Sequence, residues 1–273
     1  MTLDKTQKTV LVTGASSGIG CATVKLFLAN GWNTVALSRN LEKMKMRLPP
    51  SQSLALFTAD ISDEAQVGKS ISAALDRFGR IDVVVNNAGT GITGPFELLT
   101  DLQIRTHFET ALFGHLNVIR SVIPVMRSQG GGVIVNVTSE AGRIGFPFNS
   151  VYEAAKFGIE GFSESIRFEF KQHGIRIKIV EPGQIKTDFS ANSAVADDGD
   201  AHDLYPVFDK IKVLMRDGSK GATPETVAEV IYRAALSQKS KLRYPAASVM
   251  LKLLPFLPDR VVAFAMFTFL SRI

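Results

Sequence analysis

The sequence predicts an α/β protein: one domain over residues 1–273, with a doubly wound parallel sheet and helices on both faces. Short runs rich in β-branched residues alternate with longer segments of helical periodicity, as in successive βαβ units. Most of these runs are almost continuously apolar, which is typical of strands buried on both sides. The first run leads directly into a glycine-rich turn that precedes a helical segment.

The elements follow in regular order. Strands are predicted at residues 9–13, 34–38, 54–59, 81–86, 133–138 and 175–180, and helices near 18–30, 63–78, 101–128 and 150–173. Residues 183–222 are small, polar and acidic in part, so we expect a mobile loop beside the substrate. A helix near 224–238, with Thr223 as its cap and Pro224 in its first turn, then leads to a strand near 241–245. An apolar helical tail, about 246–273, ends the chain.

Composition narrows the classes of partner. The 273 residues are 45% hydrophobic and 21% charged, which indicates an ordered protein with a large core. The net charge of +5 favours anionic ligands, but no dense Lys/Arg block is present, so nucleic acid is not expected. The single cysteine, Cys21, excludes an intrachain disulfide and fits a reducing compartment. No metal site is expected.

The termini favour a cytoplasmic location. The N-terminus has no apolar core of a signal peptide. The most apolar tail segment, residues 261–270, is too short for a membrane-spanning helix, which needs about 20 residues. We therefore expect no transmembrane segment. Peripheral contact of the tail with a membrane surface stays an alternative.

The glycine-rich turn, TGASSGIG, indicates a phosphate-binding loop. Glycines let backbone amides approach a pyrophosphate, serine hydroxyls add donors, and the N-terminus of the next helix favours negative charge. The alternative is a plain strand-to-helix turn that happens to be rich in glycine. The residues assigned to the loop are Gly14, Ser16, Ser17, Gly18, Ile19 and Gly20.

Cofactor choice depends on the residues after the second strand. A cofactor with a free ribose 2′-OH usually meets an acidic residue here, whereas a 2′-phosphate needs a cation. The chain offers Ser38 and Arg39 and no acid. Since arginine can hold a phosphate through two donors, NADP(H) is the expected cofactor. The alternative is that Arg39 is an ordinary solvated side chain.

Five motifs occur together in order: TGASSGIG, NNAG at 86–89, Ser139, the pair Tyr152 and Lys156, and PGQIKT at 182–187. In this combination the chain resembles the short-chain dehydrogenase/reductase superfamily, whose fold is Rossmann-type. The stretch around Tyr152 resembles the hydroxysteroid and retinol dehydrogenase branch. The resemblance implies an NADP(H)-dependent oxidoreductase acting on an apolar alcohol or ketone that is steroid-, retinoid- or lipid-like. It also implies a homodimer or homotetramer.

The resemblance assigns roles residue by residue. Ser139, Tyr152 and Lys156 match the catalytic positions, and Tyr152 and Lys156 also face the cofactor. Asp60 matches the acid that meets the adenine, although it could instead cap the helix that follows. The positions that match the remaining cofactor contacts are Asn87, Ala88 and Gly89 beside the ribose and Pro182, Gly183, Ile185 and Thr187 beside the nicotinamide. Thr187 could also be a solvated loop residue.

Tyr152 and Lys156 are four residues apart and share one helix face. At about 5 Å and an effective dielectric constant of about 20, the lysine charge favours the phenolate by roughly 3 kcal/mol, or about two pKa units. The positive nicotinamide ring of an oxidised cofactor adds to this effect. We therefore expect Tyr152 to act as the general acid and base, with Ser139 bonded to the carbonyl oxygen.

One position departs from the family pattern. Ala111 stands where the family commonly has an asparagine that helps order a water relaying protons to the lysine. His107 and His115 lie four residues to either side. The favoured interpretation gives these histidines no catalytic role, and the alternative is that they form a substitute relay. Because Ala111 lacks the asparagine side chain, an alternative function is an NADP(H)-binding sensor or scaffold with weakened catalysis. The retained Ser139 favours the enzyme, because a pure binder has no need of it. A third interpretation is a membrane-surface interaction protein that uses the tail.

The substrate walls are expected from residues 90–98, 140–149, 183–222 and the tail. Their aromatic and apolar members indicate an apolar substrate but do not identify it. These members include Phe146, Phe148, Phe189, Leu204, Tyr205 and Phe208.

Overall fold

A computed structural model describes residues 6–189, 193–196, 205–216, 221–248, 250–253 and 258–272. Its centre is a parallel sheet of seven strands in the order β3-β2-β1-β4-β6-β7-β9. The strands are β1 (Thr9–Thr13), β2 (Asn33–Ser38), β3 (Leu54–Thr58), β4 (Val83–Asn86), β6 (Gly132–Val137), β7 (Ile175–Pro182) and β9 (Arg243–Ala246). The predicted doubly wound sheet is confirmed.

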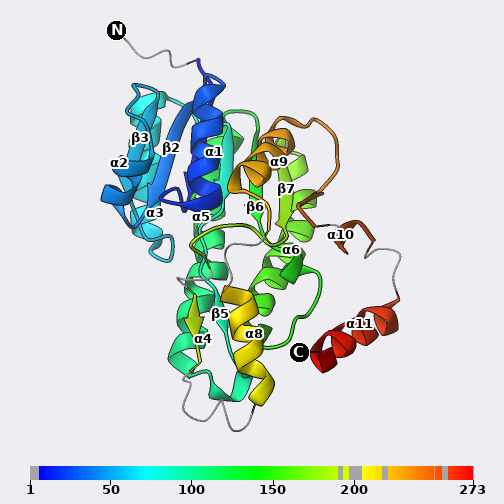
Figure 1. Ribbon diagram of the computed structural model, residues 1–273. Helices are drawn as coiled ribbons and strands as arrows, with labels where there is room; N and C mark the ends of the chain where they lie inside the picture. The colour runs from blue at the N-terminus through cyan, green and yellow to red at the C-terminus, as the bar shows by residue number, and fades with distance from the viewer. Residues whose placement is uncertain are drawn as a thin grey trace.

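Helices cover both faces of this sheet (Figure 1). One face carries α1 (Gly18–Ala29), α2 (Leu41–Arg47) and α9 (Pro224–Leu236), and the other carries α3 (Glu64–Phe78), α5 (Gly114–Ser128) and α6 (Ser150–Lys171). Side chains alternate between the two cores along each strand. Val10 and Val12 of β1 pack toward α1 and α9, whereas Leu11 packs toward α3 and α5. This double burial explains the nearly continuous apolar runs.

The strand order reverses between β1 and β4. β1 pairs with β2 on one side and with β4 on the other. In open α/β sheets, ligands bind in the crevice at the carboxyl ends of the strands where the order reverses. The glycine loop after β1 and the NNAG segment after β4 meet at this point, as the candidate site described below shows.

Helix ends follow local chemistry. The Asp63 side chain caps α3 by accepting from the Gln66 amide, and Asn40 caps α2 by accepting from the Lys43 amide. Asp60 does not cap α3, so that alternative interpretation is wrong. Thr223 occupies the N-cap position of α9, but its side chain makes no capping hydrogen bond; Pro224 begins the helix.

The helix predicted at 101–128 is interrupted. It consists of α4 (Asp101–Phe108), a π-helical turn η2 (Glu109–Phe113) and α5. In the π-turn the Gly114 amide donates to the Glu109 carbonyl, five residues back. Single π-turns are rare and occur often at functional sites. This turn contains Ala111, whose side chain is fully buried.

The segment predicted as a loop at 183–222 contains secondary structure. β8 (Ala194–Val195) pairs with β5 (Ile92–Thr93), and α8 (Pro206–Arg216) follows. Phe208 and Ile211, three residues apart, bury one face of α8. Short 3-10 turns, η1 (Phe96–Leu98) and η3 (Glu140–Gly142), complete this end of the molecule.

The tail is helical, as predicted, with α10 (Met250–Leu253) and α11 (Asp259–Arg272). In Figure 1 α11 lies outside the layers that surround the sheet. Val261, Phe264 and Phe267 on α11 have exposed fractions of 42%, 73% and 71%. Among the described residues, no helix combines the length and apolar character that crossing a membrane requires.

Candidate active site

A cleft of about 630 Å³ lies at the carboxyl ends of the central strands. Of the eighteen positions assigned from the sequence, all but Gly20 line it: Gly14, Ser16, Ser17, Gly18, Ile19, Arg39, Asp60, Asn87, Ala88, Gly89, Ser139, Tyr152, Lys156, Pro182, Gly183, Ile185 and Thr187. The fold therefore brings together residues from the ends of six strands, β1, β2, β3, β4, β6 and β7. Thr90, in the segment 90–98 expected to form a substrate wall, also lines the cleft, and so does Lys43, which was not predicted from the sequence.

The glycine loop has the geometry that close backbone approach requires. Gly14 has φ +66°, and a Cβ there would lie 2.8 Å from the Ala88 Cα. Gly18 has φ +50°, and a Cβ there would lie 3.0 Å from the Thr187 side chain. Gly20 lies beneath the loop, where a Cβ would meet the Asn87 amide nitrogen at 2.8 Å. Any side chain at these positions would crowd the floor of the cleft.

The N-terminus of α1 opens into this loop. Ser17 occupies the N-cap position but makes no side-chain capping bond, and the first turn holds no acidic residue. The first amides of a helix carry partial positive charge and favour an anion. Together with the glycine cradle, this donor set fits the pyrophosphate of a dinucleotide.

Thr13 and Asn87 join β1 to the segment after β4. The buried Thr13 hydroxyl accepts from the Asn87 and Ala88 amides at 2.9 Å each. The Asn87 side chain donates to the Thr13 carbonyl at 3.0 Å. These bonds fix the distance between the glycine loop and the NNAG segment, which form two walls of the cleft.

Cations gather at the end of β2. Arg39 Nη1 lies 3.8 Å from Asp60 Oδ2, and its side chain is 66% exposed. Lys43, one turn into α2, lies 3.6 Å from Asp188 Oδ2. Asp60 also accepts from the Ser62 amide and hydroxyl, at 3.0 and 2.7 Å, which fixes its carboxylate at the cleft.

Ser139, Tyr152 and Lys156 meet in the middle of the cleft. Ser139 follows β6 and begins η3, where its Oγ accepts from the Ala141 amide at 3.2 Å. Ser139 and Tyr152 both line the cleft, and the Ser139 hydroxyl favours the ionised form of the Tyr152 phenol. Lys156 Nζ lies 5.7 Å from the centroid of the Tyr152 ring and donates to the Val137 carbonyl at 3.3 Å. The predicted convergence of these side chains is present.

Burial dominates the electrostatics of this group. It raises the pKa of Tyr152 to about 12, although the Ser139 hydroxyl acts in the opposite direction. Burial also lowers the pKa of Lys156 to about 8, against the favourable charge of Glu160. The lysine by itself therefore does not bring the phenol toward neutral pH. The lowering of the pKa expected from the sequence included the attraction of the lysine charge but not the loss of water around the phenolate.

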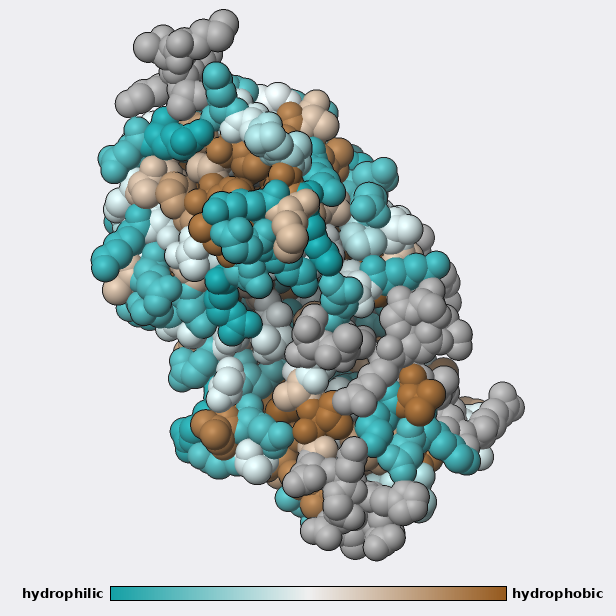
Figure 2. Space-filling view, turned by 60° about the vertical axis from the view of Figure 1, so that its left-hand side comes forward, coloured by the Kyte–Doolittle hydropathy of each residue, from teal (hydrophilic) through white to brown (hydrophobic). Residues whose placement is uncertain are grey.

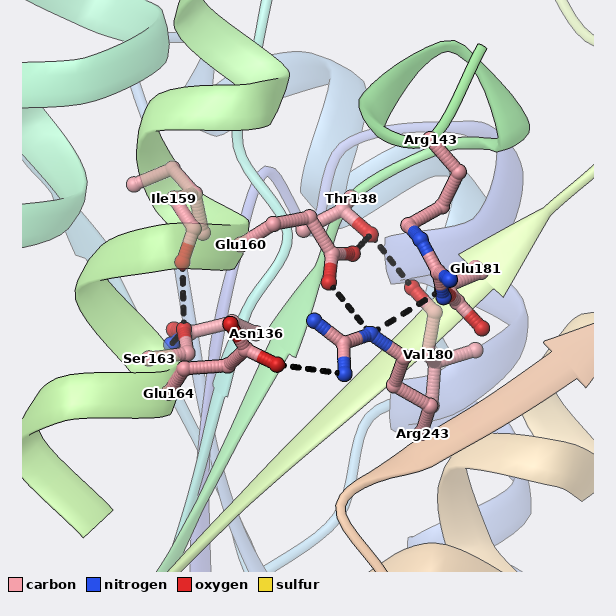
Figure 3. Close-up of polar contacts among 10 residues, drawn as sticks. All are labelled: Asn136, Thr138, Arg143, Ile159, Glu160, Ser163, Glu164, Val180, Glu181 and Arg243. Carbon is pink, nitrogen blue, oxygen red and sulfur yellow. Dashed lines mark hydrogen bonds and ion pairs between the residues drawn. The ribbon is translucent and has the colours of Figure 1, made fainter. Parts of the chain in front are cut away.

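A charged network stands behind the reacting groups (Figure 3). Glu160, one turn after Lys156, accepts from the Thr138 hydroxyl at 2.7 Å and from Arg243 Nε at 2.9 Å. Arg143 and Arg243 lie 3.0 and 3.6 Å from Glu181 Oε1. Burial raises the pKa of Glu160 to about 7, opposed by these donors.

This network joins β6, β7, β9 and α6. Thr138 directly precedes Ser139, so the bond from Glu160 ties the serine segment to the helix that carries Tyr152 and Lys156. Removing one partner of a buried charged pair leaves the other without compensation and is strongly destabilising. Figure 3 also shows Ser163 on α6 donating to the Ile159 carbonyl beside Asn136 of β6.

Aromatic side chains gather beyond the cleft. The Phe148 ring lies 5.1 Å from that of Phe208 and 5.9 Å from that of Tyr205, so α8 packs on the segment before α6. Phe189 lies 6.0 Å from the Tyr152 ring and lines the cleft. Figure 2 shows hydrophobic residues in the lower part of its face, at the height of α4, β5 and α8 in Figure 1. Leu204, also expected in these walls, lies outside the described residues.

The two helix histidines are both buried. His115 Nε2 donates to the Ala88 carbonyl at 2.7 Å, and burial lowers its pKa to about 3. His107 Nδ1 lies 3.4 Å from the Thr90 hydroxyl, and its ring centroid lies 6.0 Å from that of Tyr152. Neither histidine is a surface residue of an ordinary helix, and His107 adjoins the reacting groups.

Comparison with known proteins agrees with this geometry. The family model described as short chain dehydrogenase matches residues 8–197. The chain belongs to the short-chain dehydrogenase/reductase family. It is therefore an oxidoreductase of this family, with a Rossmann-type fold.

Relatives of this dehydrogenase/reductase extend over most of its length. It is 37% identical to the uncharacterized oxidoreductase YusZ of Bacillus subtilis, covering 88% of this chain and 89% of the relative. It is 29% identical to 3-ketodihydrosphingosine reductase of Bacteroides thetaiotaomicron, covering 94% and 96%. A crystal structure of a short-chain dehydrogenase from Streptomyces avermitilis superposes with a TM-score of 0.83 at 30% identity, covering 97% of each chain.

Proposed function

We propose that this short-chain dehydrogenase/reductase transfers a hydride between NADP(H) and an apolar alcohol or ketone. The observation that carries the proposal is the convergence of Ser139, Tyr152 and Lys156 in the same cleft as the glycine loop. A protein that only stored a dinucleotide would need the glycine loop but not a serine hydroxyl and a phenol in the same cleft.

The cofactor is NADP(H). Arg39 and Lys43 supply two cations where the ribose 2′ position would lie, and the end of β2 offers no acid to hold a free 2′-OH. Arginine matches phosphate through two parallel donors. The other cofactor contacts fall to the glycine loop, Asp60, the NNAG segment and residues 182–187. When bound, the cofactor supplies the hydride and, in its oxidised form, a positive ring.

Tyr152 holds the proton that reaches the carbonyl oxygen during reduction. With a pKa raised to about 12, the phenol is protonated at neutral pH and is a competent donor in that direction. Ser139 hydrogen-bonds the same oxygen as its charge develops. Oxidation requires the phenolate, which the positive charges of Lys156 and the oxidised cofactor together favour.

The proposed substrate class follows from the aromatic side chains in and beside the cleft. Phe189 places an aromatic ring 6.0 Å from that of Tyr152, and Phe148 and Phe208 pack against each other beyond the cleft. A steroid-, retinoid- or lipid-like carbonyl fits such a surface better than a small polar one. The name of the Bacteroides relative, 3-ketodihydrosphingosine reductase, supports the lipid-like end of this range.

A second candidate is an NADP(H)-binding sensor with weakened catalysis. It rests on Ala111, a fully buried methyl where the resemblance implies an amide. The presence of Ser139 beside Tyr152 and Lys156 in the cleft favours the enzyme.

The test is single-turnover absorbance at 340 nm with NADPH and three carbonyls: androstenedione, all-trans-retinal and methyl 3-oxododecanoate. The enzyme consumes NADPH with at least one of them. If the protein binds NADPH but consumes it with none of the three carbonyls, the sensor becomes the favoured function. Failure to bind NADPH or NADH would contradict both candidates.

A further inference from the structure

His107 is a buried polar side chain at the reaction site that the proposed mechanism leaves unused. It ends α4 and is 3% exposed. Its Nδ1 lies 3.4 Å from the hydroxyl of Thr90, which lines the cleft, and its ring lies 6.0 Å from the Tyr152 ring. Its Nε2 is buried and has no hydrogen-bond partner among the described residues.

An unpartnered nitrogen at this depth calls for an explanation. Buried polar atoms are nearly always hydrogen-bonded, and exceptions often mark functional positions. Burial and the charge of Lys156 lower the pKa of His107 to about 4, so its ring is neutral near pH 7. A neutral imidazole donates through one nitrogen and accepts through the other. His115 shows the same pattern, since its Nε2 donates to the Ala88 carbonyl at 2.7 Å and its Nδ1 has no partner among the described residues; His107 is the one whose ring lies 6.0 Å from that of Tyr152.

The π-turn brings this region against the helix of the reacting groups. η2 packs on α6, and a Cβ at Gly158 would lie 3.2 Å from the Leu112 side chain. Ala111, fully buried in the same turn, has only a methyl where the resemblance implies an asparagine amide. His107 precedes Ala111 by four residues, one turn away.

We propose that His107 is a positioning residue whose imidazole, held by Thr90, orders a water beside Lys156 and so supplies the polar side-chain group that Ala111 lacks. The inference rests on the proposed function. During reduction Tyr152 gives its proton to the carbonyl oxygen, and the Lys156 ammonium restores it. The ordered water then returns a proton to Lys156 and recovers one from bulk solvent. His107 stays neutral throughout.

Four variants test this: His107→Leu, His107→Gln, Ala111→Asn and the double variant His107→Leu with Ala111→Asn. Glutamine keeps a donor and an acceptor, whereas leucine removes both at similar size. Turnover is measured with NADPH and whichever of the three carbonyls the unmodified protein reduces fastest. The Kd for NADPH and the Tm are measured for every variant, so that damage to the fold is visible.

His107→Leu should lower kcat by about twentyfold or more with the Kd for NADPH within about twofold, in the range of proton-transfer effects. His107→Gln should retain most turnover, and the double variant should recover to within about fivefold of the unmodified protein. Ala111→Asn alone should change turnover by less than about tenfold, because His107 already fills the role.

Equal losses of turnover in His107→Leu and His107→Gln would show that the histidine is merely structural and would overturn the inference. A loss in His107→Leu that Ala111→Asn fails to restore in the double variant would show the same. So would a leucine variant with nearly unchanged turnover. A hundredfold gain in Ala111→Asn alone would show that the native relay is broken. An unmodified protein that reduces none of the carbonyls is a different result, since it contradicts the proposed function itself.

Discussion

Arg39 is the residue on which the proposed cofactor choice depends. Its guanidinium lies at the cleft, 3.8 Å from Asp60, and its exposure leaves it free to turn toward a phosphate. We expect NADP(H) to bind at least about tenfold tighter than NAD(H), a difference of about 1.4 kcal/mol. Arg39→Asp should erase or reverse this preference, because it removes the cation and adds repulsion. Titration of both cofactors by fluorescence quenching measures it.

Lys45→Asp is the matched control, since Lys45 lies on α2 with its partner Glu42 and does not line the cleft. It makes the same change of charge six residues further along the chain and should preserve the preference. Equal affinities of the unmodified protein for the two cofactors would contradict this account of Arg39.

Glu153, beside the catalytic tyrosine candidate, makes stability depend on pH. It is 8% exposed, its Oε1 accepts from the Phe146 amide, and burial raises its pKa from the ordinary 4.5 to about 7. Because the folded state binds this proton more tightly, its stabilisation is complete below pH 4.5 and is lost as pH rises through 7. The loss is at most about 3 kcal/mol. Glu153→Gln should therefore make the free energy of unfolding fall less between pH 5 and 8.

Urea denaturation at both pH values measures the effect. Glu164→Gln is the control: this carboxyl has a lowered pKa because of Arg243, so it stays ionised throughout the window. Its variant should keep the slope of the unmodified protein. An unchanged slope in Glu153→Gln would show that Glu153 is ionised in the folded protein across this range.

The sequence could reveal site residues only where a motif or an element was already visible. Gly14, Asn87 and Tyr152 belong to such motifs, and the structure brings them to one cleft. Lys43 was missed because the helix that presents it was not predicted. The raised pKa of Tyr152 was missed because burial depends on the packing of the whole site, which spacing in the sequence does not give.

At the scale of elements, periodicity predicted those with a continuous apolar face. Six of the seven sheet strands and the long helices belong to this class, and the seventh, β9, was expected from its position near the end of the alternation. The short helix α2 was missed because only Met44 among its seven residues is buried. The π-turn was missed because Glu109–Phe113 has an ordinary helical composition, and the extra residue per turn is a feature of backbone bonding. α8 did carry a signal, with Phe208 and Ile211 three residues apart after Pro206.

The helix α11 carries the prediction about the tail. Val261, Phe264 and Phe267 recur every three residues, so their exposed side chains lie on one helix face. Such a face is costly in water and marks a contact with substrate, another subunit or a membrane surface. We expect replacement of all three by serine to change substrate KM, oligomeric state or binding to anionic lipid vesicles.

Truncation before α11 is the companion variant. The cut belongs after residue 257, because β9 ends at Ala246 and Ser248 donates to Glu140 at 2.8 Å. Deleting from residue 246 would remove these contacts and disturb the sheet. If both variants match the intact protein in kinetics, light scattering and vesicle sedimentation, α11 has none of the three roles.

At the scale of the whole molecule, the alternation of strands and helices was enough to predict the architecture. Right-handed βαβ connections leave few possible orders, and the observed order places the reversal between β1 and β4. The network of Arg243 with Glu160 could not be predicted, because its members lie 83 residues apart and meet only when β9 joins the sheet. A homodimer or homotetramer, a cytoplasmic location and a single domain stay predictions.

The most direct measurement of the central claim is turnover of Tyr152→Phe with NADPH and an accepted carbonyl. The ring is kept and only the proton donor is lost, so kcat should fall at least about a hundredfold while the Kd for NADPH stays within about twofold. Phe157→Tyr, which adds a phenol to an exposed ring of the same helix, is the control and should leave turnover unchanged. A Tyr152→Phe protein that keeps most of its turnover would contradict the assignment of Tyr152 as the acid and base.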